Sequence, residues 1–271
     1  MMSTPRYVPD PGRLSVLTAS VLLTYALTHV LSTPLYPIHF SLAGLSLDFE
    51  INLNAAFAIL AAALSAAGVD WLLRAHPSIQ PGETVEHWLA PMLTALVVGI
   101  ALATLPGGGI WWVAFGIGGL LLAAVFVAEY VVVDPADTRY PLASAALTVL
   151  AFALHLILAV ALRAGGARLL FLVLAVLLAS GLVALRTLHL RLNERWEFAW
   201  ALVIALISAQ LAAGLYFWPL TPIRFGLILL GPVYGLTGVA AMLAEGEPLR
   251  RALLEPAVML GLFWGLAIWL G

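Results

Sequence analysis

Long apolar stretches recur along almost the whole chain and restrict what it can fold into. A helix that crosses a bilayer needs about 20 mostly apolar residues. Stretches of this kind lie at 14–32, 53–70, 87–105, 110–133, 142–162, 169–185, 198–218, 225–243 and 252–270. The sequence therefore predicts an all-α polytopic membrane protein. We expect about nine transmembrane helices, packed as successive helical hairpins in a single membrane-embedded domain, 1–271.

The composition agrees with this fold class and excludes several kinds of chemistry. Apolar residues make up 63% of the chain and charged residues 10%, whereas soluble domains carry about 25% charged residues. The chain has no cysteine, which excludes disulfides, thiolate catalysis and cysteine-based metal centres. Every basic residue is an arginine, which excludes a P-loop lysine and a Schiff-base lysine. The net charge of −2 does not suggest nucleic acid, and no motif implies a cofactor or a metal site.

Arginines are distributed unequally between the two sides of the predicted bundle. If successive helices alternate in direction, one side carries Arg6, Arg13, Arg74, Arg139, Arg186, Arg191, Arg195, Arg250 and Arg251, and the other carries Arg163, Arg168 and Arg224. Cytoplasmic loops of membrane proteins hold an excess of basic residues. We therefore expect a cytoplasmic N-terminal tail, 1–13, an extracytoplasmic C-terminus and a location in the inner membrane of a bacterial cell.

The segment 33–52 has a different pattern. Apolar and polar residues alternate there in two runs, separated by Ala43-Gly44. Alternation with a period of two residues is typical of β-strands, and a two-residue link is typical of a hairpin turn. We expect a small extracytoplasmic β-hairpin in which His39 faces Asp48. Its apolar face would pack on helix ends or at the lipid headgroup boundary.

The hairpin offers partners for the three arginines on the outer side. Asp48 and Glu50 would lie on the same side as Arg163, Arg168 and Arg224, so the hairpin would lie across their loops. Exposed ion pairs contribute only about 0–1 kcal/mol each, and the apolar face would supply most of the docking energy. Alternatively, Arg163 and Arg168 extend their head groups to the interface unaided; the sequence favours neither reading.

Three polar side chains lie deep in predicted spans. His155 is near the middle of its stretch, Gln210 is well inside another, and Tyr234 follows Pro232, which should kink its helix. Polar groups at such depth are functional candidates by default, and a broken helix can mark a transport site. The structural alternative, which we favour, is one hydrogen bond between helices that satisfies both His155 and Gln210.

A second set of candidates lies at the predicted cytoplasmic face: Asp70, Arg74, Glu129, Asp134 and Arg186. Carboxylates beside arginines are able to hold a divalent ion together with a phosphate-bearing lipid. No Asp-x-x-Asp pair, His-Glu-x-x-His helix or serine elbow accompanies them, however. Charged helix ends commonly form solvated ion pairs, and this reading is favoured over catalysis.

Three functional hypotheses follow. The leading one is a non-enzymatic structural, assembly or binding module, with membrane lipids around it and a protein partner on the outer hairpin. The second is a transporter or channel for a small or apolar solute, with His155, Gln210 and Tyr234 near its path. The third is a lipid-modifying enzyme with a cytoplasmic-face site that includes Asp70 and Glu129.

Overall fold

The structure is a computed structural model that describes residues 7–30, 36–42, 45–51, 53–79, 84–192 and 195–270. For 36–42, 45–51 and 53–55 it describes the backbone alone. Contacts within the chain divide it into two compact units, Met1–Asp137 and Thr138–Gly271. Each unit has a helical core of its own and is described by itself.

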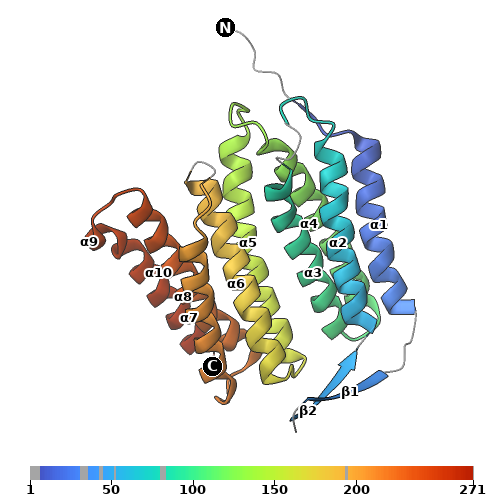
Figure 1. Ribbon diagram of the computed structural model, residues 1–271, viewed down its shortest axis with the longest axis vertical. Coiled ribbons are helices and arrows are strands. Elements are labelled where there is room, and N and C mark those ends of the chain that lie inside the picture. Colours follow the sequence, from blue (N-terminus) through green and yellow to red (C-terminus); the bar gives the residue numbers. More distant parts are fainter. Residues whose placement is uncertain are drawn as a thin grey trace. The chain divides into compact units, whose positions relative to one another are not determined.

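The first unit is a bundle of four long helices. They are α1 (Pro11–Val30), α2 (Leu53–Leu73), α3 (Leu89–Thr104), preceded by the 3₁₀ turn η1 (Val85–Trp88), and α4 (Gly109–Val131). α2 packs against α1 and α3, and α4 packs against α3 and α1 (Figure 1). The core contains Val21, Tyr25 and Phe126, each nearly inaccessible to solvent. The hydroxyl of Tyr25 donates a 2.6 Å hydrogen bond to the carbonyl of Ala95, which joins α1 to α3.

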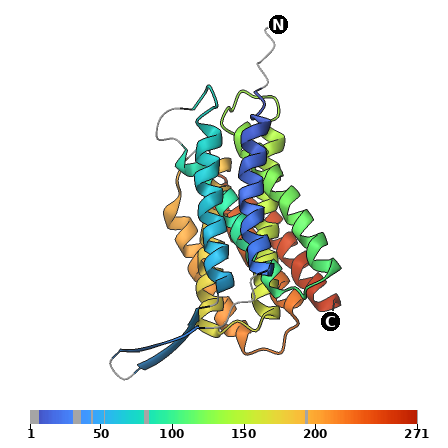
Figure 2. The same cartoon turned by 90° about the vertical axis from the view of Figure 1, so that its right-hand side faces the viewer.

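Two antiparallel strands follow α1 in the chain. β1 (Tyr36–Leu42) and β2 (Leu45–Ile51) pair so that His39 lies opposite Asp48, and Figure 2 shows them as two arrows. The side chains of both strands lie outside the described residues, and no strand occurs where side chains are described. The predicted hairpin with a packed apolar face on the outer side of a membrane therefore stays a prediction.

The second unit is built around α8. It comprises α5 (Tyr140–Ala164), α6 (Leu169–Arg191), α7 (Phe198–Tyr216), α8 (Pro222–Ala244), the short α9 (Leu249–Ala252) and α10 (Leu254–Trp269). α8 contacts each of the other five helices of the unit. One core cluster contains Leu172 of α6, Ala212 of α7, and Phe225 and Leu229 of α8, all fully buried.

The predicted membrane-spanning helices are confirmed for the described part of the chain. Nine helical segments there are long and apolar enough to cross a membrane, the last of them formed by α9 and α10 together. Large apolar side chains lie on the outside as well as in the core; Leu120 is 74% exposed and Leu142 is 75% exposed. Such surfaces suit lipid rather than water.

One predicted boundary was wrong. The sixth stretch was expected to end at Leu185, with Arg186 in the connection, but α6 continues to Arg191. Arg186 is only 3% exposed. The helix continues because residues 186–191 contain good helix formers, namely two leucines and two arginines, and because Leu188 is fully buried.

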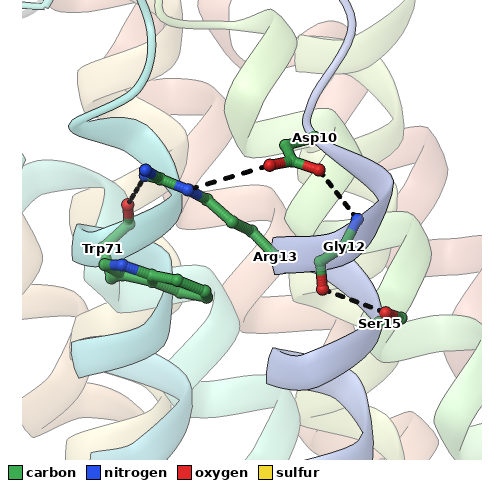
Figure 3. A network of polar contacts seen from close by, with 5 residues as sticks. All are labelled: Asp10, Gly12, Arg13, Ser15 and Trp71. Carbon is green, nitrogen blue, oxygen red and sulfur yellow. Dashed lines mark hydrogen bonds and ion pairs between the residues drawn. The ribbon is translucent and has the colours of Figure 1, made fainter.

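Arginine side chains satisfy the carbonyl groups at the ends of neighbouring helices. The last four carbonyls of a helix have no partner within it, and Arg13 of α1 donates a 3.0 Å hydrogen bond to the carbonyl of Trp71 in the last turn of α2. Its guanidinium carbon also lies 4.9 Å from the centre of the Trp71 ring. Asp10 accepts from the backbone N–H of Gly12 at 2.8 Å and so caps the start of α1 (Figure 3).

Two arginines of the second unit act in the same way. Arg163 of α5 donates to the carbonyls of Tyr216 and Trp218, at 2.9 and 2.8 Å, where α7 ends. Arg224 of α8 donates to the carbonyls of Ala267 and Ile268, at 3.1 and 3.4 Å, where α10 ends. Positive charge is also favoured at the negative end of a helix dipole.

A tryptophan performs the equivalent task in the middle of α8. Pro232 has no N–H, so the carbonyl of Ile228, four residues earlier, loses its helical partner. The indole Nε1 of Trp264 in α10 donates a 3.2 Å hydrogen bond to that carbonyl. Gly231 permits this approach, since a methyl group there would lie 2.9 Å from Leu260 and 3.3 Å from the Trp264 nitrogen.

We predict that Trp264→Phe lowers the free energy of unfolding by about 1 kcal/mol, because the Ile228 carbonyl loses its partner. Pro232→Ala restores a backbone N–H, so Trp264→Phe should cost less in that background. Unfolding midpoints of the purified protein in a mild detergent, followed by circular dichroism, measure both. Trp269→Phe serves as the control, since Trp269 is 79% exposed on the same helix. An equal cost of Trp264→Phe in both backgrounds would contradict the assignment.

Candidate functional site

The second unit contains a pocket of about 540 Å³, which lies between α5, α6, α8 and α10. Its wall is mainly apolar, but seven polar or charged side chains reach it. The polar and charged residues are Ser144, Thr148, Thr187, Arg191, Tyr234, Thr237 and Glu255. Mostly apolar walls with a few converging polar groups are typical of small-molecule sites, which commonly have volumes of about 300–1,000 Å³.

Five of the seven polar residues come from the ends of α5, α6 and α10, whereas Tyr234 and Thr237 lie well inside α8. Ser144 and Thr148 lie in the first turns of α5, and Thr187 and Arg191 in the last turns of α6. Glu255 lies in the first turn of α10. Helix ends bring short polar side chains to the border between an apolar core and the surrounding polar phase, so the pocket is polar on one side and apolar on the other.

Thr187 is the polar group in this wall whose hydrogen-bonding capacity is least used. Its side chain is 7% exposed, and its Oγ1 has no hydrogen-bond partner among the described residues. A buried hydroxyl without a partner costs about 1–3 kcal/mol. The Oγ1 atom itself has almost no accessible surface, so it does not open on the pocket.

Two contacts that involve charged side chains lie at the pocket. Tyr234 donates a 3.2 Å hydrogen bond from its hydroxyl to Glu255 Oε1, which joins α8 to α10. Arg191 forms a two-point ion pair with Glu245, at 2.8 and 3.2 Å. The arginine charge is therefore compensated, and its guanidinium is held in place.

Three aromatic rings line the same pocket. The ring of Tyr234 lies 5.1 Å from that of Phe152 and 6.1 Å from that of Phe263, measured between ring centres. Phe152 is nearly buried. The rings connect α5, α8 and α10 across the pocket.

A second hollow, of about 430 Å³, lies in the same unit near the start of α8. Its wall includes Leu215, Trp218, Ile228, Trp264 and the arginine Arg224, and is otherwise apolar. Both guanidinium contacts of Arg224 already go to helix-end carbonyls. The hollow thus offers a ligand little besides apolar contact.

The predicted hydrogen bond between His155 and Gln210 was wrong. His155 is 1% exposed, and neither ring nitrogen has a hydrogen-bond partner in the described part of the chain. Gln210 is exposed on α7 instead. Neither residue lines either of the two hollows. Of the three predicted intramembrane residues, only Tyr234 belongs to the pocket.

The predicted cytoplasmic-face residues of the first unit form separate pairs. Asp70 Oδ2 accepts from Arg74 Nε at 2.7 Å, and Asp70 Oδ1 accepts from the hydroxyl of Thr84 at 2.5 Å. The Arg74 side chain is 71% exposed. Asp134 accepts from the backbone N–H of Ala136 and shapes its own turn.

Glu129 is fully buried and meets His87, a pairing that the sequence did not predict. His87 Nδ1 and Glu129 Oε2 are 2.7 Å apart, and both side chains are inside the bundle. Glu86 Oε1 lies 3.5 Å from the other ring nitrogen of His87. Within the described residues, no group of three histidine or acidic side chains is arranged to hold a metal ion.

His76 closes the same end of the first unit. Its ring packs edge-on against Tyr7 at 5.1 Å and Tyr130 at 4.7 Å, and its Nδ1 accepts from the backbone N–H of Ser78. Burial lowers the pKa of His76, although Asp134 and Asp137 oppose the shift. These contacts make His76 a packed, neutral side chain at neutral pH.

Two of the outer arginines predicted to meet the hairpin have other partners among the described residues. Arg163 and Arg224 bind helix-end carbonyls. Arg168 is exposed at the start of α6. The side chains of His39, Asp48 and Glu50 lie outside the described residues, so their ion pairs with these arginines stay a prediction.

The fold defines a class: an all-helical protein whose described residues form nine helical segments long and apolar enough to span a membrane, with a cavity of about 540 Å³ in one of its two units. Residues 32–270 match the family model described as Protein of unknown function (DUF5656), and the chain belongs to that family. No curated protein matches the sequence. No solved structure matches it either.

We predict that Glu129→Ala lowers the free energy of unfolding by about 3–5 kcal/mol, because it leaves His87 buried without its partner. The double variant His87→Ala/Glu129→Ala should lose less than the sum of the single variants, by about 0.5–3 kcal/mol. Arg74→Ala, which breaks an exposed pair in the same unit, should cost no more than about 1 kcal/mol. Denaturant unfolding in detergent measures all four variants. Strict additivity of the two single losses would show that the pair is not coupled.

Proposed function

We propose that the protein is a non-enzymatic binding module of the membrane that holds an amphiphilic small molecule between α5, α6, α8 and α10. The observation that carries this proposal is the mixed character of the pocket, which has mainly apolar walls and seven polar or charged side chains, among them Tyr234 and Glu255. A ligand with a polar head and an apolar body would meet both kinds of wall.

The contacts in the first unit support a structural role there rather than catalysis. Asp70 is held by Arg74 and Thr84, and Glu129 by His87. A carboxylate that acts on a substrate needs a free path to it, and both groups are engaged within the bundle. We therefore assign these pairs to stability of the helix ends.

A transport role is the second candidate. It is favoured by the presence of two hollows along the same pair of helices, α8 and α10, one near each end of α8. Between them lies the Pro232 break, which Trp264 seals through the Ile228 carbonyl. Movement of a solute between the hollows would require this contact to open.

We further propose that the N-terminus is cytoplasmic, the C-terminus extracytoplasmic, and the protein part of a bacterial inner membrane. The excess of arginines on one side supports this orientation. It places the polar side of the pocket at the cytoplasmic face. It also places the segment 33–52 outside, where a protein partner would meet it.

A tryptophan in the pocket wall should prevent binding. Ala145 lines the pocket on α5, and its neighbour Ala146 is exposed but does not line it. We expect native mass spectrometry of the protein purified in a neutral detergent to show a bound small molecule that is lost in Ala145→Trp and kept in Ala146→Trp. Retention of the adduct in Ala145→Trp would place the binding elsewhere and refute the pocket.

The absence of cysteine makes the orientation directly testable. Single substitutions Ala164→Cys, after α5, and Glu247→Cys, between α8 and α9, add one exposed thiol each. A maleimide that cannot cross membranes should label Ala164→Cys in intact cells, and Glu247→Cys only after permeabilisation. The reverse pattern would invert the proposed orientation.

A further inference from the structure

The hydroxyl groups of the pocket face a ligand as acceptors. A serine or threonine hydroxyl has one proton to donate and two lone pairs. Ser144, Thr148 and Thr237 donate their protons to carbonyls of their own helices, at 3.2, 2.9 and 2.7 Å. Tyr234 donates its proton to Glu255. What remains for a ligand at these four oxygens is lone pairs.

The charge at the pocket is also one-sided. Arg191 is neutralised by its two-point pair with Glu245. Glu255 lines the pocket and accepts from Tyr234, and among the described residues no arginine lies within ion-pair distance of it. One uncompensated carboxylate therefore stands beside a group of hydrogen-bond acceptors.

The three rings add a third preference in the same direction. Phe152, Tyr234 and Phe263 are linked through contacts at 5.1 and 6.1 Å, and all three line the pocket. Aromatic faces attract cations through the negative charge above the ring. The rings offer apolar contact to a hydrocarbon chain as well.

We propose that the pocket recognises an amphiphile whose head is a protonated amine, with the ammonium group at Glu255 and Tyr234 and the hydrocarbon part against the apolar wall. This inference rests on the proposed function, since it names the chemical class of the molecule that the pocket binds. An ammonium group has N–H donors. The hydroxyl oxygens of Ser144, Thr148 and Thr237 have lone pairs left to accept hydrogen bonds from such donors.

Three other classes fit less well. An anionic head group would lie beside the Glu255 carboxylate, and the charge of Arg191 is already paired with Glu245. A quaternary ammonium group would satisfy the charge and the rings, but it carries no N–H donor for the hydroxyl oxygens. A neutral sugar head supplies donors but no positive charge.

The test uses four photoreactive probes that share a dodecyl chain with a diazirine and differ in the head: primary amine, trimethylammonium, sulfate and maltoside. Each is cross-linked at neutral pH to the full-length protein in a neutral detergent, and labelled peptides are identified by mass spectrometry. We expect the amine to label peptides of α5, α8 and α10 roughly tenfold more than the sulfate or maltoside, and more than the trimethylammonium probe.

A variant of Glu255 probes the head-group contact. Glu255→Gln should reduce amine labelling of the pocket by roughly tenfold and leave maltoside labelling unchanged. Thr187→Val should leave amine labelling unchanged, because Thr187 Oγ1 has almost no accessible surface. Glu247→Gln is the control, because Glu247 pairs with Arg251 outside the pocket.

The outcomes distinguish a failure of this inference from a failure of the proposed function. Equal labelling of the pocket by all four heads would leave a binding pocket but overturn the preference for an amine. Stronger labelling by the sulfate, or no effect of Glu255→Gln, would overturn it as well. If none of the probes labels the pocket, the proposed function itself fails.

Discussion

Every carbonyl at a helix end needs a hydrogen-bond donor, and in a lipid-facing bundle water supplies few of them. This chain meets the need with side chains from neighbouring helices. Arg13 serves the end of α2, Arg163 the end of α7 and Arg224 the end of α10. Each arginine belongs to one helix and binds a carbonyl at the end of another. The same hydrogen bonds that satisfy the carbonyls therefore also fix the position of the two helices along each other. Guanidinium groups suit this task better than ammonium groups, since one arginine is able to reach two carbonyls at once.

The pocket depends on this bracing along α8 and α10. Arg224 joins the two helices at the start of α8, Trp264 joins them in the middle, and Tyr234 joins them through Glu255 near the other end. Gly238 permits close contact on this side, since a methyl group there would lie 3.3 Å from Pro256. The hollow opens where this seam meets α5 and α6. A helix with an internal proline, such as α8, needs an external donor for its free carbonyl, and the contact of Trp264 with Ile228 supplies it.

The sequence predicted the membrane spans well because hydrophobic length is a property of single segments. It grouped Tyr234 with His155 and Gln210, which do not line the pocket, because the depth of a residue in a helix does not show which face of the helix it occupies. Glu255 and Thr187 were missed: a single carboxylate or hydroxyl near a helix end has no sequence signal, and only packing brings them to one cavity.

The two units differ in what lies beside their polar groups. In the first unit the carboxylates are held by neighbours, as Glu129 is by His87 and Asp70 is by Arg74. In the second unit Tyr234 and Glu255 line a cavity of about 540 Å³ whose wall is mainly apolar. Polar groups in an apolar setting cost stability unless they have partners. A cavity of this size with converging polar groups has the character of a small-molecule site, and on this ground we propose ligand binding in the second unit.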